Sequence, residues 1–215
     1  MKLLLVRHGR TLANVAGALD TSLPGLPLDA VGLEQAASLP GRLTADGHLT
    51  AITSLWVSPI LRARETIAPI EAATGLTAQV RSGLREVLAG DIEMNTDARS
   101  VRCYTDTTRS WMVGRTGARI PGSPEDGADT FERFNGVVEE IAAATDAEDP
   151  DSSALLVAHG TVLRLWVALA AARAAGADPA WVAEHPMRNT GITVVHGDPQ
   201  GGWRLTSWNE GDWSA

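Results

Sequence analysis

Two short segments of the chain end in the same pair of residues. Residues 4–9 (LLVRHG) and 155–160 (LLVAHG) are each an apolar run of strand length that stops at a histidine and a glycine, before a segment able to form a helix. Ligands of an open parallel sheet bind at the carboxyl ends of its strands, so His8 and His159 are predicted to lie where such a fold does chemistry. Arg7 beside His8 makes this a poor metal site but a good place for a nucleophile that faces a phosphate.

Two other predicted strand ends carry polar residues of the same kind. Arg62 lies just past the strand predicted at Leu55–Val57, in the first turn of the next helix, and Glu86 comes a few residues after a weaker strand at Thr77–Val80. Guanidinium groups bind phosphate oxygens through paired donors that stay charged, and a carboxylic acid can give a proton to a leaving alkoxide. The rim of the sheet is therefore predicted to collect groups suited to phosphoryl transfer.

The elements that must position these residues alternate between strands and helices. Asp29 has the place of an N-cap before one helix, and Gly75 has the place of a C-cap after the next. The late strands Gly191–His196 and Trp203–Trp208 flank a turn and are predicted to form a hairpin at the sheet edge. The alternation favours a three-layer α/β/α fold with a mainly parallel central sheet. We also expect helices at about 129–144 and 161–175, a solvated loop at 146–151 and an irregular segment at 93–127.

Composition excludes several classes of protein. The chain has 215 residues, of which 44% are hydrophobic, so it can bury a sizeable core, and no change in composition divides it into two domains. The net charge of −8 argues against a nucleic-acid partner or an anionic membrane surface. No apolar stretch approaches the length of a membrane span, no signal-peptide pattern is visible, and the lone Cys103 cannot form an internal disulfide. We therefore expect a cytoplasmic protein, and a homodimer is compatible with the sequence.

The residues at these strand ends, and their order along the chain, resemble those of the histidine phosphatase superfamily, also called phosphoglycerate-mutase-like. The resemblance covers essentially the whole chain and is to the phosphatase branch. It implies a phosphoglycerate-mutase-like fold, one domain over residues 1–215, and a variable, pocket-covering insertion at about 94–129. The matching positions are Arg7-His8-Gly9-Arg10-Thr11 with Asn14, Ser58-Pro59 with Arg62-Ala63 and Thr66, Leu84-Arg85-Glu86 with Gly90 and Glu93, His159-Gly160, and residues 189–193 (NTGIT).

The resemblance implies a role for each of the five central residues. His8 would be the nucleophile, attacking as the neutral imidazole to form a phosphohistidine that water then hydrolyses. Arg7 and Arg62 would hold the phosphate oxygens, and His159 would add a cationic donor to the same oxygens when phosphate is bound. Glu86 would donate the proton to the leaving alkoxide, because a nearby phosphate dianion disfavours the ionised carboxylate.

Other positions are secondary candidates. Asn14 would be a neutral donor to the substrate, and Thr11 and Gly160 would be substrate-binding positions. Glu93 is the nearby substitute for Glu86 as the acid. Many family members carry Gly-Glu-Ser before the long helix, where this chain has residues 127–129 (GAD), so the contact usually made by that glutamate is in doubt. Five arginines of the insertion are mostly solvated in this interpretation, although they could contact a second anionic group: Arg99, Arg102, Arg109, Arg115 and Arg119.

Partial matches to other phosphate-binding motifs do not predict a second site. Residues 103–110 fit the Cys-x5-Arg-Ser pattern of cysteine-dependent phosphatases, but they contain no glycine, and Asp106 would repel an anion. Lys2 is the only lysine, so a Walker-type phosphate loop is excluded, and no Gly-x-Gly-x-x-Gly turn supports a dinucleotide. The remaining histidines lack metal-ligand spacing. We expect no metal and no cofactor.

These features predict a metal-independent phosphomonoester hydrolase acting on a small phosphorylated metabolite, such as a sugar phosphate or a phosphoglycerate derivative. One alternative is a phosphoglycerate-type mutase, which shares the first half-reaction but must keep its intermediate away from water. Another is a non-catalytic module of the same fold that binds a phospholigand or a protein. The insertion does not resemble the mutase pattern. Residues suited to phosphoryl transfer follow all four of the predicted strand ends, which disfavours a module without activity.

Overall fold

A seven-stranded sheet forms the centre of the computed structural model, which describes residues 1–145 and 152–212. The strand order is β3-β2-β4-β1-β5-β6-β7, and β3, β2, β4 and β1 run parallel to one another, whereas β5, β6 and β7 continue the sheet antiparallel. The mainly parallel sheet and the edge hairpin are as predicted. The strands span Lys2–Arg7 (β1), Ile52–Val57 (β2), Gln79–Val80 (β3), Ser153–Ala158 (β4), Ile192–Asp198 (β5), Gly202–Trp208 (β6) and Gly211–Asp212 (β7).

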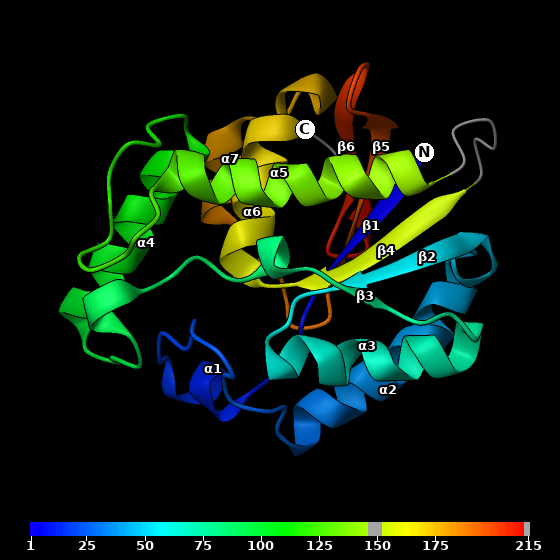
Figure 1. Ribbon diagram of the computed structural model, residues 1–215, viewed down its shortest axis with the longest axis horizontal. Coiled ribbons are helices and arrows are strands. Elements are labelled where there is room, and N and C mark those ends of the chain that lie inside the picture. The colour runs from blue at the N-terminus through cyan, green and yellow to red at the C-terminus, as the bar shows by residue number, and fades with distance from the viewer. Residues whose placement is uncertain (146–151, 213–215) are drawn as a thin grey trace.

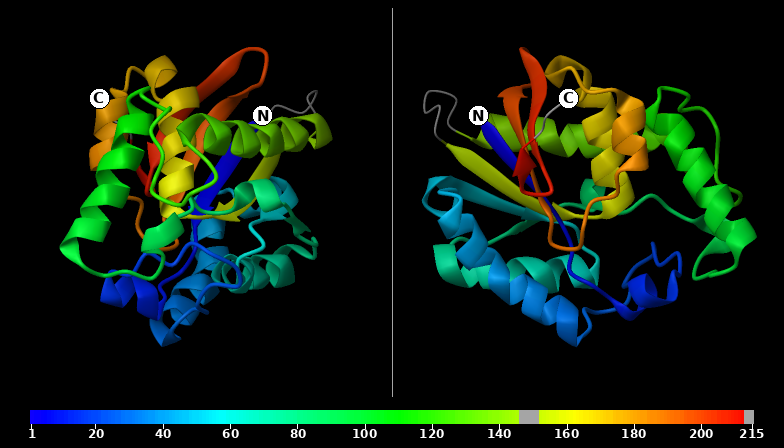
Figure 2. Two further views of the ribbon diagram at one scale, coloured as in Figure 1. Left: turned by 60° about the vertical axis from the view of Figure 1, so that its left-hand side comes forward. Right: turned by 180° about the vertical axis from the view of Figure 1, so that it is seen from behind.

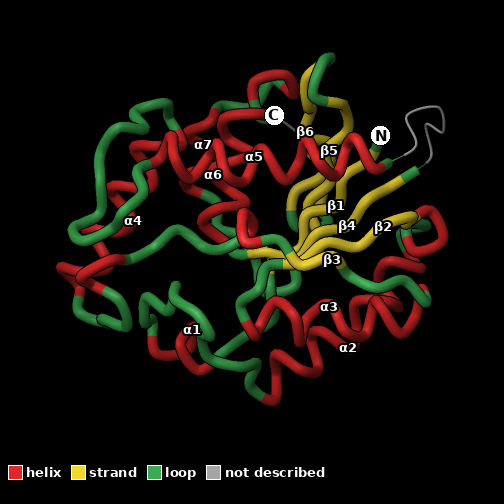
Figure 3. Tube along the Cα trace, viewed as in Figure 1, coloured by secondary structure: helices red, strands yellow, loops and turns green. Residues whose placement is uncertain are grey.

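Helices cover both faces of the sheet (Figures 1 and 3). The helices α2 and α3 pack on one face, and α5, α6 and α7 lie on the other, which gives the predicted three layers. Strand β1 shows why both layers are needed: Leu3 and Leu5 belong to one apolar cluster, and Leu4 and Val6 belong to the other. The helices span Leu12–Ala16 (α1), Ala30–Ala45 (α2), Leu61–Thr74 (α3), Ala98–Met112 (α4), Gly127–Ala144 (α5), Gly160–Ala170 (α6) and Pro179–Glu184 (α7).

The predicted helix ends next to the sheet are confirmed. The Asp29 side chain accepts a hydrogen bond from the Gly32 N–H at 2.8 Å and so caps α2. Gly75 ends α3 in the left-handed conformation, with φ 73°, which a residue without a Cβ adopts readily. The helix expected to reach residue 175 is shorter, because α6 stops at Ala170 and a separate 3-10 turn covers Arg173–Ala175.

The expectation of an irregular segment at 93–127 is wrong for its first half, which contains α4. Asp97 caps this helix by accepting from the N–H groups of Arg99 and Ser100. Tyr104, Thr108 and Trp111 recur at helical spacing and are buried. The glycines and prolines that suggested irregular structure all follow Met112. The loop expected at 146–151 lies outside the described residues.

Strands β1 and β4 bring the two histidine corners together. The two strands are parallel neighbours in register, and Arg7 is paired with Ala158. His8 and His159 therefore leave the sheet at the same rim, on the side where α1 and the start of α6 lie (Figure 2). Among the described residues, none of the helices is both long enough and apolar enough to cross a membrane.

Candidate active site

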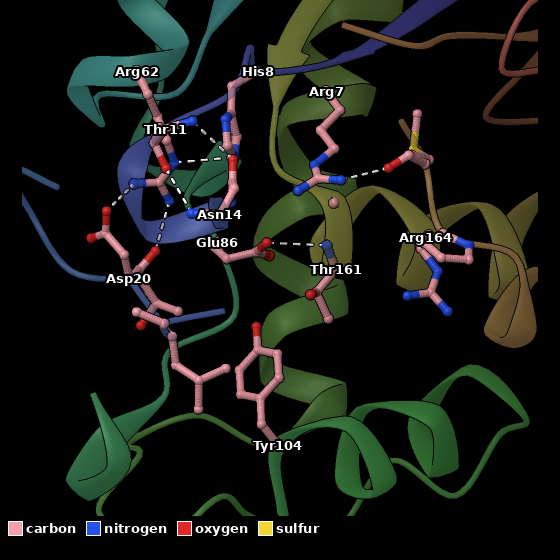
Figure 4. Close-up of a pocket in the computed structure, with 16 residues that line it drawn as sticks. Arg7, His8, Thr11, Asn14, Asp20, Arg62, Glu86, Tyr104, Thr161 and Arg164 are labelled. Atoms are coloured by element: carbon pink, nitrogen blue, oxygen red, sulfur yellow. Dashed lines mark hydrogen bonds and ion pairs between the residues drawn. The ribbon is translucent and has the colours of Figure 1, made fainter. Parts of the chain in front are cut away.

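A cavity of about 240 Å³ opens at this rim (Figure 4). All the predicted site residues except His159 line it: Arg7, His8, Thr11, Asn14, Arg62, Glu86 and Gly160. His159 is fully buried beside the cavity, with its ring centroid 5.2 Å from that of His8. The fold therefore gathers residues from four separate strand ends, as the sequence predicted.

The hydrogen bonds of His8 define which ring nitrogen can act as a nucleophile. Its Nδ1 lies 2.7 Å from the carbonyl oxygen of Gly9, which can only accept, so Nδ1 carries the proton. Its Nε2 is then unprotonated, and its lone pair accepts from the Nε–H of Arg62 at 3.1 Å. The nitrogen beside the cavity's arginines is therefore the unprotonated one.

Burial and two cations keep the His8 ring neutral. Desolvation lowers the pKa of His8 well below its usual 6.5, and the neighbouring charges of Arg62 and then Arg7 lower that pKa further. The hydrogen bond to the Gly9 carbonyl acts in the opposite direction and is the smaller effect. At physiological pH the ring thus has the charge state that a nitrogen nucleophile requires.

His159 is held differently. Its Nε2 lies 2.8 Å from the Ser58 hydroxyl, and its Nδ1 is buried without a hydrogen-bond partner among the described residues. Burial lowers the pKa of His159 well below 6.5, and the charges of Arg62 and Arg7 add to this effect. Ser58 was part of the sequence resemblance, but its contact with His159 joins residues far apart in the chain and was not predicted.

Arg62 is shared between the nucleophile and a carboxylate that sequence reasoning missed. Its Nη1 lies 3.3 Å from an Asp20 carboxylate oxygen, and its Nη2 donates to the Asp20 carbonyl oxygen at 2.9 Å. Both side chains are almost fully buried, at 3% and 7% exposure. Burial is the largest influence on the Arg62 pKa and lowers it, whereas the negative charges of Asp20 and Glu86 oppose this shift. This arginine therefore has a counter-ion within the protein.

Arg7 differs from Arg62 because it makes no ion pair with a described residue. Its Nη1 donates to the Met187 carbonyl oxygen at 2.6 Å, which fixes the guanidinium beside the cavity. A Cβ at Gly160 would lie 3.2 Å from the Arg7 Nε, so a side chain at this position would press on the guanidinium. Burial, opposed by Glu86, lowers the pKa of Arg7.

Three backbone amides hold the carboxylate of Glu86. Its Oε1 accepts from the N–H groups of Val87 and Val162, each at 2.9 Å, and its Oε2 accepts from the Thr161 N–H at 3.0 Å. Two of these amides belong to the first turn of α6, where the helix dipole favours an acidic group. Oε1 thus accepts two backbone donors, and Oε2 accepts one.

The secondary candidates have structural partners as well. Thr11 is the N-cap of α1, and Asn14 completes the capping box by accepting from the Thr11 N–H at 3.2 Å. Asn14 is exposed and lines the cavity. Glu93 lies outside the cavity lining and binds the loop after α1, accepting from Thr21 and from the Ser22 N–H. The loop contact explains its presence without a role as the acid.

The cavity lining also includes residues that the sequence did not single out, among them Tyr104 of α4 and Thr161 and Arg164 of α6. Arg164 carries a recognisable signal, since it follows the His159-Gly160 corner on the same helix. The five insertion arginines are exposed, and none of them lines the cavity. Cys103 lies inside α4 rather than in a phosphate-binding loop, and Trp111 is core.

Comparison with known proteins agrees with this geometry. Residues 3–211 match the family described as the histidine phosphatase superfamily (branch 1). The chain belongs to the histidine phosphatase superfamily. The resemblance seen in the sequence is thus confirmed over nearly the whole chain, and the match includes every residue placed in the cavity.

Curated relatives and a solved structure match nearly the whole chain. A PE-PGRS family protein of Mycobacterium tuberculosis is 32% identical over 95% of this chain, which spans only 35% of that protein. Glucosyl-3-phosphoglycerate phosphatase of the same organism is 30% identical over 97% of this chain and 94% of its own length. A structure of the mycobacterial glucosyl-3-phosphoglycerate phosphatase with VO3 has a TM-score of 0.77 at 27% identity, covering 97% of this chain and 98% of that one. The relatives named as phosphatases favour the phosphatase interpretation over the mutase and non-catalytic alternatives.

Proposed function

We propose that the protein hydrolyses phosphomonoesters of small metabolites through a phosphohistidine formed on Nε2 of His8. The observation that carries the proposal is the protonation pattern of this ring: Nδ1–H donates to Gly9, and the unprotonated Nε2 lies next to Arg62 at the cavity. A neutral imidazole held in one orientation is ready to attack without first losing a proton.

The remaining residues have complementary roles in this proposal. Arg7 and Arg62 bind the phosphate oxygens. The net positive charge that these two arginines offer the phosphate is less than +2, because the Asp20 carboxylate pairs with Arg62. The bound dianion would favour protonation of the buried His159, which then donates to a third oxygen. The cavity-facing groups of Asn14, Thr11 and Gly160 complete the phosphate and substrate contacts.

The two chemical steps use Glu86 in both directions. In the first, the His8 Nε2 lone pair forms a bond to phosphorus, the bond from phosphorus to the ester oxygen breaks, and protonated Glu86 gives its Oε2 proton to the departing alkoxide. In the second, a water oxygen attacks phosphorus, the phosphorus–nitrogen bond breaks, and the water proton passes to Glu86. The amide donors of α6 hold the carboxyl in one place throughout.

The proposed substrate class is a small phosphorylated metabolite, supported by the size of the cavity and by the relatives named after such substrates. The segment 94–129 contributes Tyr104 to the lining, which supports its proposed role as the part that covers the site. The whole chain would then work as one catalytic domain.

Trapping the intermediate tests the proposal. Rapid alkaline quenching of the protein with radiolabelled 3-phosphoglycerate or a labelled sugar phosphate should leave label on the peptide that contains His8. The His8→Ala variant should carry none, whereas Cys103→Ser should label normally. Label on any other residue, or turnover by His8→Ala, would overturn the assignment. Released phosphate, measured against phosphate transferred between the hydroxyls of 2- or 3-phosphoglycerate, separates hydrolysis from mutase activity.

A further inference from the structure

Helix α6 presents a second polar residue to the cavity one turn beyond the groups that hold Glu86. Thr161 and Arg164 both line the cavity, and their spacing of three residues places them on one face of the helix. The α-helix rises about 1.5 Å per residue, so Arg164 lies about 4.5 Å further along the axis than Thr161. No step of the proposed hydrolysis uses the Arg164 guanidinium.

The guanidinium of Arg164 is fixed on one edge and free on another. Its Nε donates to the Val182 carbonyl oxygen at 3.0 Å, and its Nη2 donates to the Ala183 carbonyl oxygen. These bonds use two of the five N–H groups of the guanidinium and hold it against α7. Its Nη1 has no hydrogen-bond partner, and no acidic side chain pairs with it, among the residues that the structure describes. The remaining N–H groups form a fork that a planar anion can fill.

The charges around Arg164 leave this end of the cavity positive. Burial lowers the pKa of Arg164 to about 10, and the nearby positive charges of Arg109 and Arg7 contribute to the shift. Glu86 acts in the opposite direction, but it is a single negative charge against the positive charges of Arg164, Arg109 and Arg7. Arg62, in contrast, has the Asp20 carboxylate beside it. Arg164 therefore lacks the internal counter-ion that Arg62 possesses.

The position of Glu86 relates this fork to the reaction. If Glu86 protonates the leaving oxygen, that oxygen lies near the Thr161 amide, which donates to the same carboxyl. Figure 4 shows Glu86 and Thr161 between the His8–Arg62 side of the cavity and the Arg164 guanidinium. The alcohol part of a substrate, which extends away from phosphorus at this oxygen, thus has Arg164 within reach.

We propose that Arg164 binds a second anionic group carried by the alcohol part of the substrate, a carboxylate or a further phosphate. The inference rests on the proposed phosphatase function and narrows its substrates to esters whose leaving alcohol is itself negatively charged. It also explains why the guanidinium is anchored by carbonyl oxygens instead of an acid, since a carboxylate partner would occupy the fork.

Direct binding measurements test this assignment with two ligands that differ at one position. 3-Phosphoglycerate has a carboxylate where glycerol 3-phosphate has a hydroxymethyl group. Calorimetry on the His8→Ala protein, which prevents turnover, should show that 3-phosphoglycerate binds roughly 10- to 100-fold more tightly, the range expected for a charge-assisted contact. The affinities for fructose 1,6-bisphosphate and fructose 6-phosphate give the same comparison for a second phosphate. The ligand pair with the larger ratio of affinities identifies the anion that the site binds.

Removing the guanidinium should abolish the preference and leave the common phosphate contact intact. In the Arg164→Met background, 3-phosphoglycerate and glycerol 3-phosphate should bind with similar affinity, and Arg164→Lys should restore part of the difference. Arg204→Met, which removes an exposed charge on β6, is the control and should keep the full preference.

Three outcomes would count against the proposal. A protein with no preference within either ligand pair has no second anion subsite, and an Arg164→Met protein that keeps the preference places that subsite elsewhere. A uniform loss of affinity for both ligands of a pair would show that Arg164 only positions α7, and the phosphatase function would stand. If no phosphate ester binds at all, the proposed function itself fails.

Discussion

The two histidine corners begin from nearly the same sequence and end with different hydrogen bonds. Both follow parallel, paired strands, and both rings are buried and have lowered pKa values. The His8 ring is bound on both nitrogens, by the Gly9 carbonyl oxygen and by Arg62. The His159 ring is bound on Nε2 alone, by Ser58. In the first arrangement the unprotonated Nε2 accepts from the Arg62 cation at the cavity, and in the second Nδ1 has no partner among the described residues.

The chain after each corner differs as well. After Gly9, it continues through Thr11 into the short helix α1, and Asn14 of this helix and residues 18–21 after it line the cavity. After His159, the helix α6 begins at once, and its first amides bind Glu86. Equivalent strand ends therefore differ because different backbone follows them: one corner offers the proposed nucleophile, and the other offers helix amides that hold the proposed acid.

Replacing each histidine by alanine should have the largest effect and separate the two roles. His8→Ala removes the proposed nucleophile, so kcat should fall by on the order of 10⁴-fold or more. His159→Ala removes one donor to the phosphate, so kcat should fall by about 10²- to 10³-fold while the intermediate still forms. Steady-state kinetics and intermediate trapping check both. Equal losses, with no intermediate in either variant, would mean that the two corners are not distinct.

Changing Glu86 to glutamine should lower kcat for alkyl phosphates by roughly 10²- to 10⁴-fold, because the leaving alkoxide then receives no proton. Inhibition by inorganic phosphate should change little. p-Nitrophenyl phosphate, whose leaving group needs no proton, should be affected much less than an alkyl ester. Glu93→Gln is the matched control, since Glu93 does not itself line the cavity and instead binds the loop residues Thr21 and Ser22. The role would move to Glu93 if the losses were reversed between the two variants.

Stability should fall as the pH drops below about 6.5. The folded rings of His8 and His159 have lowered pKa values, so near pH 6.5 the unfolded chain takes up protons that the native state does not. The stabilisation is complete above the unfolded pKa and declines as the pH falls towards the lower native values. Each ring contributes a slope of at most about 1.4 kcal/mol per pH unit. Urea unfolding between pH 7 and 5 should show a smaller slope for His8→Asn than for the original protein. An unchanged slope would mean that this ring is protonated in the native state.

Ser58→Ala should have the smallest effect, because it removes one hydrogen bond and leaves the His159 ring in place. A typical hydrogen bond contributes about 0.5–1.5 kcal/mol, so kcat should fall by about 2- to 10-fold with little change in KM. Ser38→Ala, which removes an exposed hydroxyl on α2, is the control. A loss as large as that of His159→Ala would instead show that Ser58 contacts the phosphate itself.

The sequence predicts those parts of the fold and site that depend on local patterns. Apolar runs, caps such as Asp29 and Gly75, and the chemical residues at strand ends are read within a few positions of each other. Helix α4 was missed because its buried face is sparse and partly polar, with Thr108 among its members. Asp20 could not be assigned from sequence, since its pairing with Arg62 depends on how a loop folds back over α3.

Arg164 was predictable from the sequence only in part. Its place on α6 after Gly160 follows from helical periodicity, so its presence at the rim could have been inferred. That it has no acidic partner among the described residues could not have been inferred, because this depends on which carbonyl oxygens of α7 come into reach.

The central place of β1 has a consequence for how the protein forms on the ribosome. Although β1 emerges first, its hydrogen-bonding neighbours β4 and β5 begin only at Ser153 and Ile192. A nascent chain that ends before Ser153 carries Arg7, His8, Arg62 and Glu86 but lacks both of the described strands that pair with β1. Long-range pairings of this kind form slowly and leave apolar strand edges open until they close. Enzymatic competence should therefore arise late in synthesis, and N-terminal fragments should depend on chaperones to stay in solution.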